Sequence, residues 1–446
     1  MNKKILIAGL LVSVMLLVPI NSAYSNNCLF VKNNEENIHN DNLLDDTWIK
    51  IIDYTTYDTG NSVIQDTDGN YIFVVTGEPW SGWTGAIIYK INSNGDTIWI
   101  KEFGDLDDDR KVSSIIEINN CNYVATGLRD WKVWLVKLSK NGDKIWDKGF
   151  YIPRFAEGNE VIQTFDGGFA IAGYALNYSG DLDCSNIFLL KTDNNGNETW
   201  IKTFDNKLYN YGFSLKQTPD GGYIIVGYTS PSDYGKDKMY LLKTDENGTL
   251  LWEKTYGGSG YSAGLSLLIT DDGEYIITGC TRTNLVDDYD IWLLKTDENG
   301  TLLWEKTYGG KYDDIGYSVK TTDGGGYILT GSSYISLFNC DVILIKTDNL
   351  GNKEWSKTTG SSYVDYAKSI QKTTDGGFIL TGTCADNESD FPFGGKDAFL
   401  MKTDSNGNAP PLSKTKDIGI RNRVFDSSFL RLLFERLFGI WRFILV

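Results

Sequence analysis

A tryptophan recurs along this chain about every fifty residues, each time within the same short pattern. The recurring residues are Trp48, Trp99, Trp146, Trp200, Trp252, Trp304 and Trp355. Trp48 precedes the first full copy of the pattern, and the seventh copy ends at Gly407 without its tryptophan. A fixed period means that each repeat is one small structural unit that buries its apolar face against its neighbours. The chain is therefore predicted to be an array of seven such units.

Each repeat contains four short segments rich in β-branched and aromatic residues, as the copy from Thr270 to Gly310 illustrates. Asp-Gly and Asn-Gly pairs separate these segments, and such pairs are strong hairpin signals. The two turns recur around Gly69, Asn120, Gly167, Gly221, Gly273, Gly325 and Gly376, and around Gly95, Gly142, Gly196, Gly248, Gly300, Gly351 and Gly407. We predict an all-β fold, a seven-bladed β-propeller of four-stranded antiparallel blades.

The two ends of the repeat array are complementary. After Gly407 the chain continues with Pro410 and Pro411, and proline cannot donate a hydrogen bond to a strand ladder. Residues 47–52 have the pattern of an outer strand but follow no repeat. We predict that this N-terminal strand completes the last blade and closes the ring, which removes the exposed edges of an open array.

The repeated tryptophans and acidic turns have structural interpretations. One bulky aromatic residue at the same place in every blade suits packing between blades, so the tryptophans are not interpreted as a cofactor site. Asp and Asn in the turns tolerate left-handed backbone and bond their own backbone. A Ca²⁺ site at Asp245–Gly248 and its copies is the alternative, but the EF-hand alternation and distal glutamate are missing. No cofactor and no metal are predicted.

The regions outside the repeats differ in composition. Residues 1–25 have two lysines and then an apolar run, as a secretory signal peptide does. Residues 26–45 are rich in Asn and acidic residues, contain the single histidine, His39, and are predicted to be a disordered leader. The propeller is assigned to residues 46–410, and a basic linker with an amphipathic C-terminal helix to 411–446.

Residues 429–446 group their charges on one side of a helix, where Arg431, Glu435 and Arg442 lie close in angle. The charges make a membrane-spanning helix a poor fit, whereas a helix at the membrane surface is compatible with them. We expect this tail to attach the protein to a surface or to act as a sorting tag. A helix docked on the propeller is the alternative.

Charge and residue types exclude several classes of function. A net charge of −17 argues against nucleic-acid binding. Because the single histidine precedes the repeats, the ring has none for a Ser-His-Asp triad or a histidine metal site. Paired carboxylates could still hydrolyse glycosides, although their simpler interpretation is solvated loop acids or turn caps. The candidates are Asp107, Asp108, Asp109, Asp287, Asp288, Asp290, Asp313 and Asp314.

The six cysteines and five glycosylation sequons fit an exported protein but leave alternatives open. Disulfides between Cys280 and Cys340, or between Cys340 and Cys384, are compatible with the blade positions, and buried thiols are the alternative. The sequons at Asn177, Asn197, Asn247, Asn299 and Asn387 mark glycosylation, or follow from the composition of the turns.

Ligand binding is expected on the variable loops between the second and third strands, because function must vary between otherwise similar blades. The predicted ligand-binding residues are Trp80, Trp83, Trp131 and Tyr178. A second recurring set is interpreted as a turn and cap that feed each inner strand. It comprises residues 58–62, 210–214, 314–318 and 365–369.

The repeats resemble a family of secreted bacterial and archaeal propellers whose units read roughly TxDGGYIxxG and then DxWLxKTDxxGxxxW. The match is good at residues 218–227, 239–252, 291–304, 322–331 and 374–382, and loose in the first two repeats. Such proteins are grouped loosely with quinoprotein-like propellers. The resemblance implies the fold and an extracellular location, but no catalytic residue.

We therefore expect an exported, cell-surface, non-enzymatic module that binds or adheres to a glycan or a protein. Contact with the membrane surface is expected through residues 429–446, and no nucleic acid is expected as a partner. The alternative is a glycan-active enzyme, a hydrolase or lyase, that uses loop carboxylates.

Overall fold

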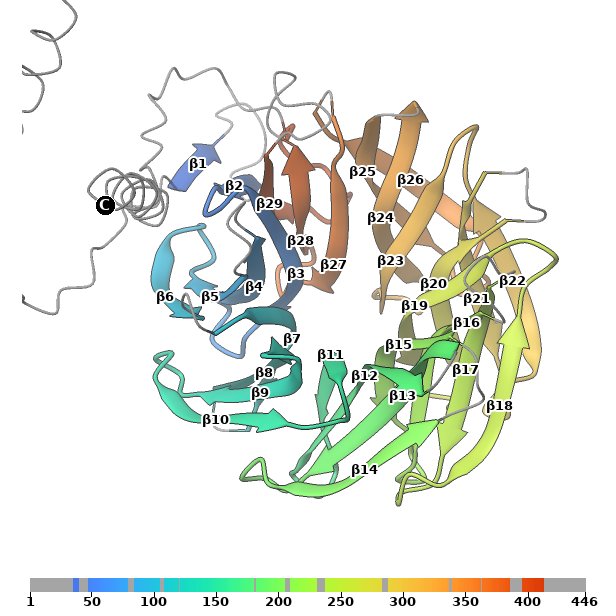
Figure 1. The fold of residues 1–446 in the computed structure, drawn as a ribbon. Coiled ribbons are helices and arrows are strands. Elements are labelled where there is room, and N and C mark those ends of the chain that lie inside the picture. Colours follow the sequence, from blue (N-terminus) through green and yellow to red (C-terminus); the bar gives the residue numbers. More distant parts are fainter. Residues whose placement is uncertain are drawn as a thin grey trace, which may run out of the picture. The chain divides into compact units, whose positions relative to one another are not determined.

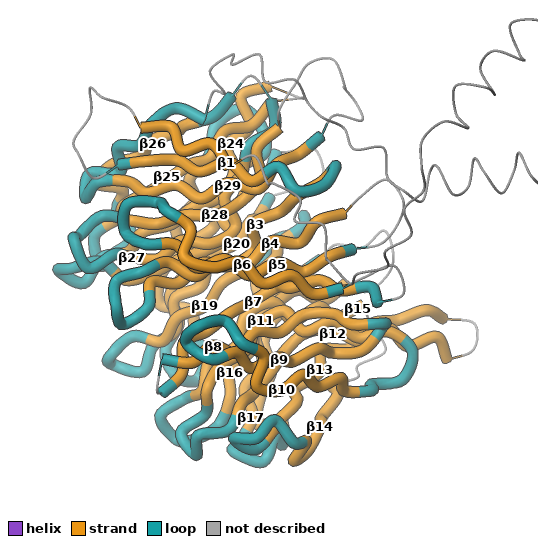
Figure 2. The backbone as a smooth tube through the Cα atoms, turned by 90° about the vertical axis from the view of Figure 1, so that its left-hand side faces the viewer, coloured by secondary structure: helices purple, strands orange, loops and turns teal. Residues whose placement is uncertain are grey.

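The computed structural model describes residues 35–39, 47–78, 84–104, 108–119, 121–179, 182–204, 209–230, 237–282, 288–336, 339–361, 363–385 and 395–412. Every regular element in these ranges is a β-strand (Figure 1), which confirms the all-β prediction. Many of the hairpin turns gather on one side (Figure 2). No helix among these residues has the length and apolar character needed to cross a bilayer. The predicted signal peptide and residues 413–446 lie outside the described residues.

Antiparallel strands pair in groups of four that follow the chain. Group 1 contains β3 (Tyr57–Gln65), β4 (Tyr71–Glu78), β5 (Gly85–Ile91) and β6 (Thr97–Phe103). Group 2 contains β7 (Arg110–Ile118), β8 (Asn122–Arg129), β9 (Lys132–Leu138) and β10 (Lys144–Phe150). Group 3 contains β11 (Phe155–Gln163), β12 (Phe169–Ser179), β13 (Leu182–Thr192) and β14 (Glu198–Phe204).

The next three groups repeat this meander. Group 4 contains β15 (Tyr209–Gln217), β16 (Tyr223–Ser230), β17 (Lys238–Thr244) and β18 (Leu250–Tyr256). Group 5 contains β19 (Ser262–Ile269), β20 (Tyr275–Thr281), β21 (Asp290–Thr296) and β22 (Leu302–Tyr308). Group 6 contains β23 (Asp314–Thr321), β24 (Tyr327–Ser336), β25 (Asn339–Thr347) and β26 (Lys353–Thr359).

Group 7 combines strands from both ends of the chain. It contains β27 (Tyr366–Lys372), β28 (Phe378–Ala385), β29 (Lys396–Thr403) and β2 (Trp48–Ile52). Strand β2 pairs antiparallel with β29, with Trp48 opposite Lys402 and Ile52 opposite Ala398. Strand β1 (Glu35–His39) pairs with the other edge of β2. These five residues belong to the segment 26–45, where the sequence predicts no regular structure.

Groups 7 and 1 are neighbours. The Ser369 hydroxyl of β27 accepts a hydrogen bond from the backbone N–H of Val63 in β3, at 3.2 Å. The same bond joins groups 5 and 6, where Ser266 accepts from the N–H of Val319 at 3.3 Å. The contact between the last and first groups is thus of the same kind as a contact between groups that follow each other in sequence.

The hydrophobic core is divided among the junctions between groups. One buried cluster joins Ile72 and Val74 of group 1 to Val112 and Tyr123 of group 2. The other junctions between consecutive groups have equivalent clusters. The junction between groups 7 and 1 has one as well, and it includes Trp48. Because both faces of each sheet are covered, the second and third strands are apolar almost throughout.

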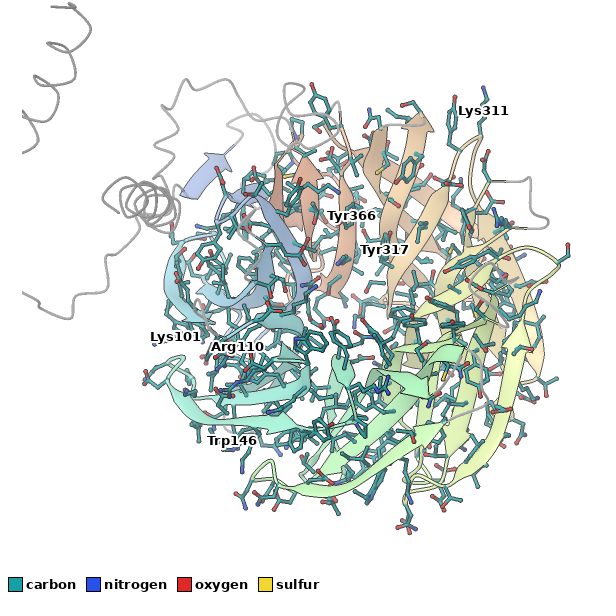
Figure 3. The ribbon with its side chains drawn as sticks, in the orientation of Figure 1. Lys101, Arg110, Trp146, Lys311, Tyr317 and Tyr366 are labelled. Carbon is teal, nitrogen blue, oxygen red and sulfur yellow. The ribbon has the colours of Figure 1, made fainter. Side chains whose placement is uncertain are left out.

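The repeated tryptophans lie on the outer strands and contact the next group. Trp146, on β10 at the periphery (Figure 3), lies against Gly196 in the turn of group 3. Gly196 has a φ of +73°, and a Cβ there would come within 2.7 Å of the indole ring. Glycine is therefore required at this position both by the backbone conformation and by the approach of the ring.

Candidate functional site

Every inner strand has a β-bulge at the same place in its pairing with the second strand. In β3, for example, the register shifts between Gly60 and Ser62, which leaves Asn61 unpaired. A bulge gives the extra residue a new direction without ending the strand. The bulge residues, one in each group, are Asn61, Ser113, Asn159, Phe213, Leu265, Tyr317 and Lys368.

All of these bulge residues line one cavity of about 490 Å³. We call it the axial cavity, because the innermost strand of every group contributes to it. The remaining lining residues come from groups 1 to 3 and are polar: Thr59, Thr76, Glu78, Lys111 and Glu157. Tyr317 and Tyr366 lie on the neighbouring inner strands β23 and β27, with ring centroids 5.9 Å apart (Figure 3). The site is thus assembled by tertiary contacts between distant segments.

Two carboxylates of the axial cavity differ in environment. Glu78 forms an ion pair with Lys111 at 3.1 Å. Burial disfavours the charged form of Lys111, but the bond to Glu78 outweighs it and raises the pKa of Lys111. Burial also raises the pKa of Glu157, and Lys111, the hydroxyl of Tyr174 and Lys368 offset this only in part. Glu157 is therefore more easily protonated than an ordinary, solvated glutamate.

The amide side chains of the cavity are oriented by backbone carbonyls. Asn61 donates to the carbonyl of Val112 at 2.8 Å and accepts from the ammonium of Lys368 at 3.0 Å. Asn159 donates to the carbonyl of Gly212 at 2.7 Å. Each of these hydrogen bonds links two strand groups. The contacts between groups therefore hold the polar side chains of the cavity in place.

A row of aromatic side chains, which we call the aromatic row, runs beside the cavity across groups 2 to 5. Successive ring centroids are 4.7 to 6.2 Å apart. It touches the cavity where Tyr174 donates to Glu157 at 3.3 Å and where Phe213 packs on Tyr228 at 5.8 Å. The row consists of Trp131, Phe155, Tyr174, Tyr211, Tyr228, Tyr261 and Tyr289.

The predicted ligand-binding residues are described only in part. Trp131 is 65% exposed and forms the outer end of the aromatic row, and its φ of +70° is uncommon for a non-glycine residue. Trp80 and Trp83 lie outside the described residues. Tyr178 belongs to β12, but its side chain is likewise outside the description. These four residues remain predicted anchors.

Three of the loop acids proposed from the sequence, Asp109, Asp313 and Asp314, accept backbone hydrogen bonds. Asp109 accepts a hydrogen bond from the backbone N–H of Thr84 at 2.9 Å. Asp313 accepts one from the N–H of Tyr289 at 2.9 Å, and Asp314 one from Gly310 at 2.8 Å. Asp107 and Asp287 lie outside the described residues. These three acids thus stabilise local backbone structure.

Two arginines of group 2 are neutralised within the fold. Arg110 forms ion pairs with Asp108 at 2.5 Å and with Asp147 at 3.0 Å. Arg129 shares Asp147 at 3.3 Å, and the indole nitrogen of Trp134 donates to the same carboxylate at 2.7 Å. With its side chain only 7% exposed, Arg110 serves the structure rather than ligand binding.

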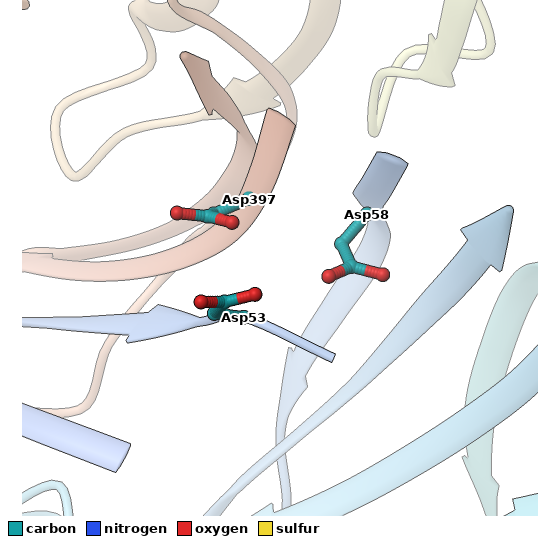
Figure 4. Close-up of side chains that lie close together, drawn as sticks. All are labelled: Asp53, Asp58 and Asp397. Carbon is teal, nitrogen blue, oxygen red and sulfur yellow. The ribbon is translucent and has the colours of Figure 1, made fainter. Parts of the chain in front are cut away.

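Asp53, Asp58 and Asp397 converge at the junction of groups 7 and 1, with ligand oxygens within 4.8 Å of one another (Figure 4). Asp58 accepts hydrogen bonds from the backbone N–H groups of Tyr54 and Thr55, at 2.6 and 2.8 Å. Burial raises the pKa of Asp58 to about 6 despite these bonds. The carboxylate of Asp58 caps the turn that leads from β2 into β3.

Cys280 and Cys340 are buried thiols, and neither forms a disulfide. Burial raises the pKa of each to about 12. A thiol with so high a pKa is a poor nucleophile and metal ligand at neutral pH. The proposed pairing of Cys280 with Cys340, or of Cys340 with Cys384, is therefore absent from the described residues.

The interpretation of residues 58–62 and their copies as a turn and cap is confirmed for the cap and wrong for the turn. The carboxylates of Asp58, Asp314 and Asp365 accept backbone hydrogen bonds from the residues before them, but most of each segment is strand. Residues 58–62 and 210–214 lie within β3 and β15, and residues 314–318 begin β23. Residues 365–369 lead into β27. A sequence signal was present: the residue between a position that is mostly glycine and one that is mostly serine changes far more from repeat to repeat than these two neighbours do. That variable position is the bulge.

No family model matches the chain, and no curated protein matches it either. Among solved structures, the Pan2 WD40 domain of Neurospora crassa is similar over 83% of this chain and 99% of its own, with 11% identity and a TM-score of 0.50. A protein of unknown function from Bacteroides caccae is similar over 65% of this chain and 91% of its own, with 13% identity and a TM-score of 0.40. At such identity the likeness to the WD40 domain shows the fold alone: the chain has a propeller-like fold.

Proposed function

We propose that this protein is a closed, seven-bladed β-propeller that binds a carbohydrate in its axial cavity. One observation carries the proposal: one bulge residue from each of groups 1 to 7 lines the same cavity, and only groups 1 and 3 share a residue type, asparagine, at this position. A repeating scaffold gains specificity where its symmetry is broken. Closure is supported by the pairing of β2 with β29 and by the core between groups 7 and 1.

The lining favours a polar, uncharged ligand with several hydroxyl groups. Glu157 and Asn159 offer acceptors, Lys368 offers a donor, and Phe213 and Tyr317 offer apolar faces. Two carboxylates and two ammonium groups leave the cavity without a net formal charge. Sugars combine hydroxyl groups with apolar C–H faces, which suit such a mixture of polar groups and aromatic rings. The neighbouring aromatic row would extend the contact to further sugar units.

The proposed location is the cell surface of the exporting organism. It rests on the signal-like residues 1–25, the repeat resemblance and the basic tail, with residues 429–446 in contact with the membrane surface. A glycan of the envelope or a glycosylated protein would then be within reach of the cavity.

A glycan array followed by calorimetry on the full chain tests the proposal. Glu157→Gln and Lys368→Met should each weaken binding of the best ligand at least about tenfold, because each removes a charged hydrogen-bonding group. Glu298→Gln, in an exposed turn, is the matched control and should bind normally. Unchanged affinity in both cavity variants would move the binding site elsewhere.

A glycan-active enzyme is the second candidate, now with the carboxylates of the cavity rather than those of the loops. The observation that favours it is the raised pKa of Glu157 beside Glu78, which is paired with Lys111. A carboxyl group with a raised pKa and a second carboxylate paired with a lysine suit an acid and its partner in glycoside cleavage. Release of reducing sugar that is lost in Glu157→Gln would support catalysis. Tight binding of the intact glycan without release of reducing sugar would instead support a binding protein without this activity.

A further inference from the structure

An arginine lies at one end of the aromatic row. Arg282 directly follows β20 of group 5, and its backbone N–H donates a hydrogen bond to the carbonyl of Tyr261 at 3.0 Å. The central carbon of its guanidinium group lies 4.9 Å from the ring centroid of Tyr289, the last member of the row. A cation at this distance from an aromatic ring is attracted by it. The row therefore has Trp131 at one end and a positive charge at the other.

The guanidinium group of Arg282 has no acidic partner. Among the described residues it forms no ion pair, in contrast to Arg110 and Arg129 of group 2. Its Nε atom is shielded from solvent and has no hydrogen-bond acceptor. A buried donor without an acceptor costs free energy unless a bound group supplies one. In a chain with a net charge of −17, an arginine without an acidic partner requires an explanation.

One acid lies near Arg282 but does not neutralise it. Asp237 directly precedes β17 of group 4. Burial raises the pKa of Asp237, and a hydrogen bond from Ser230 and the charge of Arg282 offset this only in part. A close ion pair would hold the pKa of a carboxyl below its usual value. The carboxylate of Asp237 thus remains separate from the guanidinium group.

The position of Arg282 suits a planar anion. Stacking on Tyr289 covers one face of the guanidinium group, and the side chain as a whole is only half-buried. The fork of N–H groups in an arginine matches the two oxygens of a carboxylate. The ring of Tyr261 lies 5.2 Å from that of Tyr289 and provides an aromatic surface beside this fork.

We propose that Arg282 binds the carboxylate of an acidic sugar, such as a uronic acid, at the end of the aromatic row. This inference rests on the proposed binding of carbohydrate in the axial cavity. Phe213 of the cavity packs on Tyr228 at 5.8 Å, and Tyr228 lies 6.0 Å from Tyr261. An oligosaccharide with an uncharged unit in the cavity follows these rings toward Arg282. The ligand class is then a glycan with a carboxylated unit, whose oxygens supply the acceptors that Arg282 lacks.

Binding of the full chain to pairs of oligosaccharides tests this inference. Each pair consists of an oligosaccharide that contains a uronic acid and its carboxyl-reduced, neutral form, and calorimetry measures both affinities. The best acidic member should bind at least about tenfold more tightly than its reduced form, because it gains charged hydrogen bonds. Arg282→Met should remove this preference and leave the affinity for the reduced form unchanged.

Two further variants define what Arg282 contributes. Arg282→Lys keeps the charge but not the planar fork, so it should retain only part of the preference. The control Lys353→Met changes the net charge equally at an exposed position of β26 and should keep the preference in full.

The outcomes separate this inference from the binding proposed for the axial cavity. Glu157→Gln should weaken the binding of both members of a pair, because it acts on the unit that they share. Equal affinity for both forms, or a preference that persists in Arg282→Met, overturns the role of Arg282. The effect of Glu157→Gln would still uphold the axial cavity in that case. Absence of binding to every pair would contradict both proposals.

A measurement on the unaltered protein covers the case in which Arg282→Met does not fold. In protein with ¹⁵N-labelled arginine, the Nε–H signal of Arg282 is assigned by comparison with Arg282→Lys. The acidic oligosaccharide should shift this signal, whereas the carboxyl-reduced form should leave it in place. The same response to both forms overturns the inference.

Discussion

The indole nitrogen of Trp48 donates a hydrogen bond to the backbone carbonyl of Ser93 at 3.0 Å. Trp48 lies on β2 in group 7, and Ser93 lies in the last turn of group 1. Trp99 makes the same bond to Lys140 at 3.3 Å, from group 1 to group 2. The same side chain thus joins the ends of the array and two groups that are consecutive in sequence. This equivalence is the best support for the proposed closed ring.

Removal of β2 should open this junction. Trp48, Ile49, Ile51 and Ile52 are all buried, and without them β29 has an unpaired edge. We expect a chain without residues 26–53 to aggregate and to melt at a clearly lower temperature. A chain without residues 26–46, which loses β1 alone, should melt close to the parent. Size-exclusion chromatography and calorimetry make the comparison, and equal melting temperatures would contradict closure by β2.

The contact between tryptophan and glycine at the group junctions can be separated from backbone strain. Gly248 and Gly273 have similar φ values, +75° and +80°, but a Cβ at Gly248 would come within 2.7 Å of Trp200, whereas nothing lies within 4 Å at Gly273. Gly273→Ala should cost about 1 kcal/mol of folding free energy, the penalty for left-handed backbone. Gly248→Ala should cost about 1 to 3 kcal/mol more because it overpacks the junction. Denaturant unfolding measures both, and equal losses would mean that the indole ring simply moves aside.

Loss of Asp147 should destabilise group 2. Asp147→Ala removes a counter-charge of Arg110, whose side chain is 7% exposed, and removes the acceptor for Trp134. Breaking a buried pair in this way should cost about 3 kcal/mol. The control is Asp143→Ala, which removes a 75% exposed carboxylate 3.5 Å from Lys101 and should cost less than about 1 kcal/mol. If urea unfolding gave the same loss of unfolding free energy for both variants, the ion pairs around Arg110 would contribute no more to stability than an exposed ion pair does.

Asp58 should make stability fall as the pH rises from about 4 to about 6. Its pKa is about 6 in the folded protein and 3.8 when unperturbed, so in this window the folded state holds a proton that the unfolded state has lost. The fall should amount to about 3 kcal/mol at most. Asp58→Asn, which still accepts the turn hydrogen bonds, should flatten the curve of unfolding free energy against pH.

Asp245 provides the control for Asp58, because its effect has the opposite sign. The backbone N–H of Thr249 holds the pKa of Asp245 below its usual value, so its contribution is present above pH 4 and is lost in acid. Asp245→Asn should leave the fall between pH 4 and 6 unchanged. A persistent fall in Asp58→Asn would assign it to other acids.

Trp131 should contribute to binding and little to stability. Its side chain is 65% exposed and contacts the aromatic row only through Phe155, at 6.2 Å. With a ligand from the glycan array, Trp131→Ala should cost on the order of 2 kcal/mol of binding free energy. The unfolding free energy should change by less than about 0.5 kcal/mol. Phe169→Ala, in the buried core, should show the reverse pattern. Normal affinity in Trp131→Ala would restrict the site to the axial cavity.

The sequence by itself determined the local structure of this protein. Asp-Gly and Asn-Gly pairs specify hairpins from a few neighbouring residues, and alternating apolar segments specify strands. The all-β meander and the turn at Gly196 could therefore be predicted from the printed chain. The role of the strand at residues 47–52 could also be predicted. The repeat array has one extra outer strand at its start, and its last repeat lacks an outer strand.

Only the tertiary structure decided which side chains meet. Asn61 and Lys368 are more than 300 positions apart, and a hydrogen bond of 3.0 Å joins them because groups 7 and 1 are neighbours. The bulge that turns such residues toward the axial cavity arises from the pairing of two strands. The sequence of one strand alone does not reveal it and resembles that of a turn. The local sequence pattern specifies strands and turns. The axial cavity depends instead on distances between strands of different groups, and no short segment of sequence determines these distances.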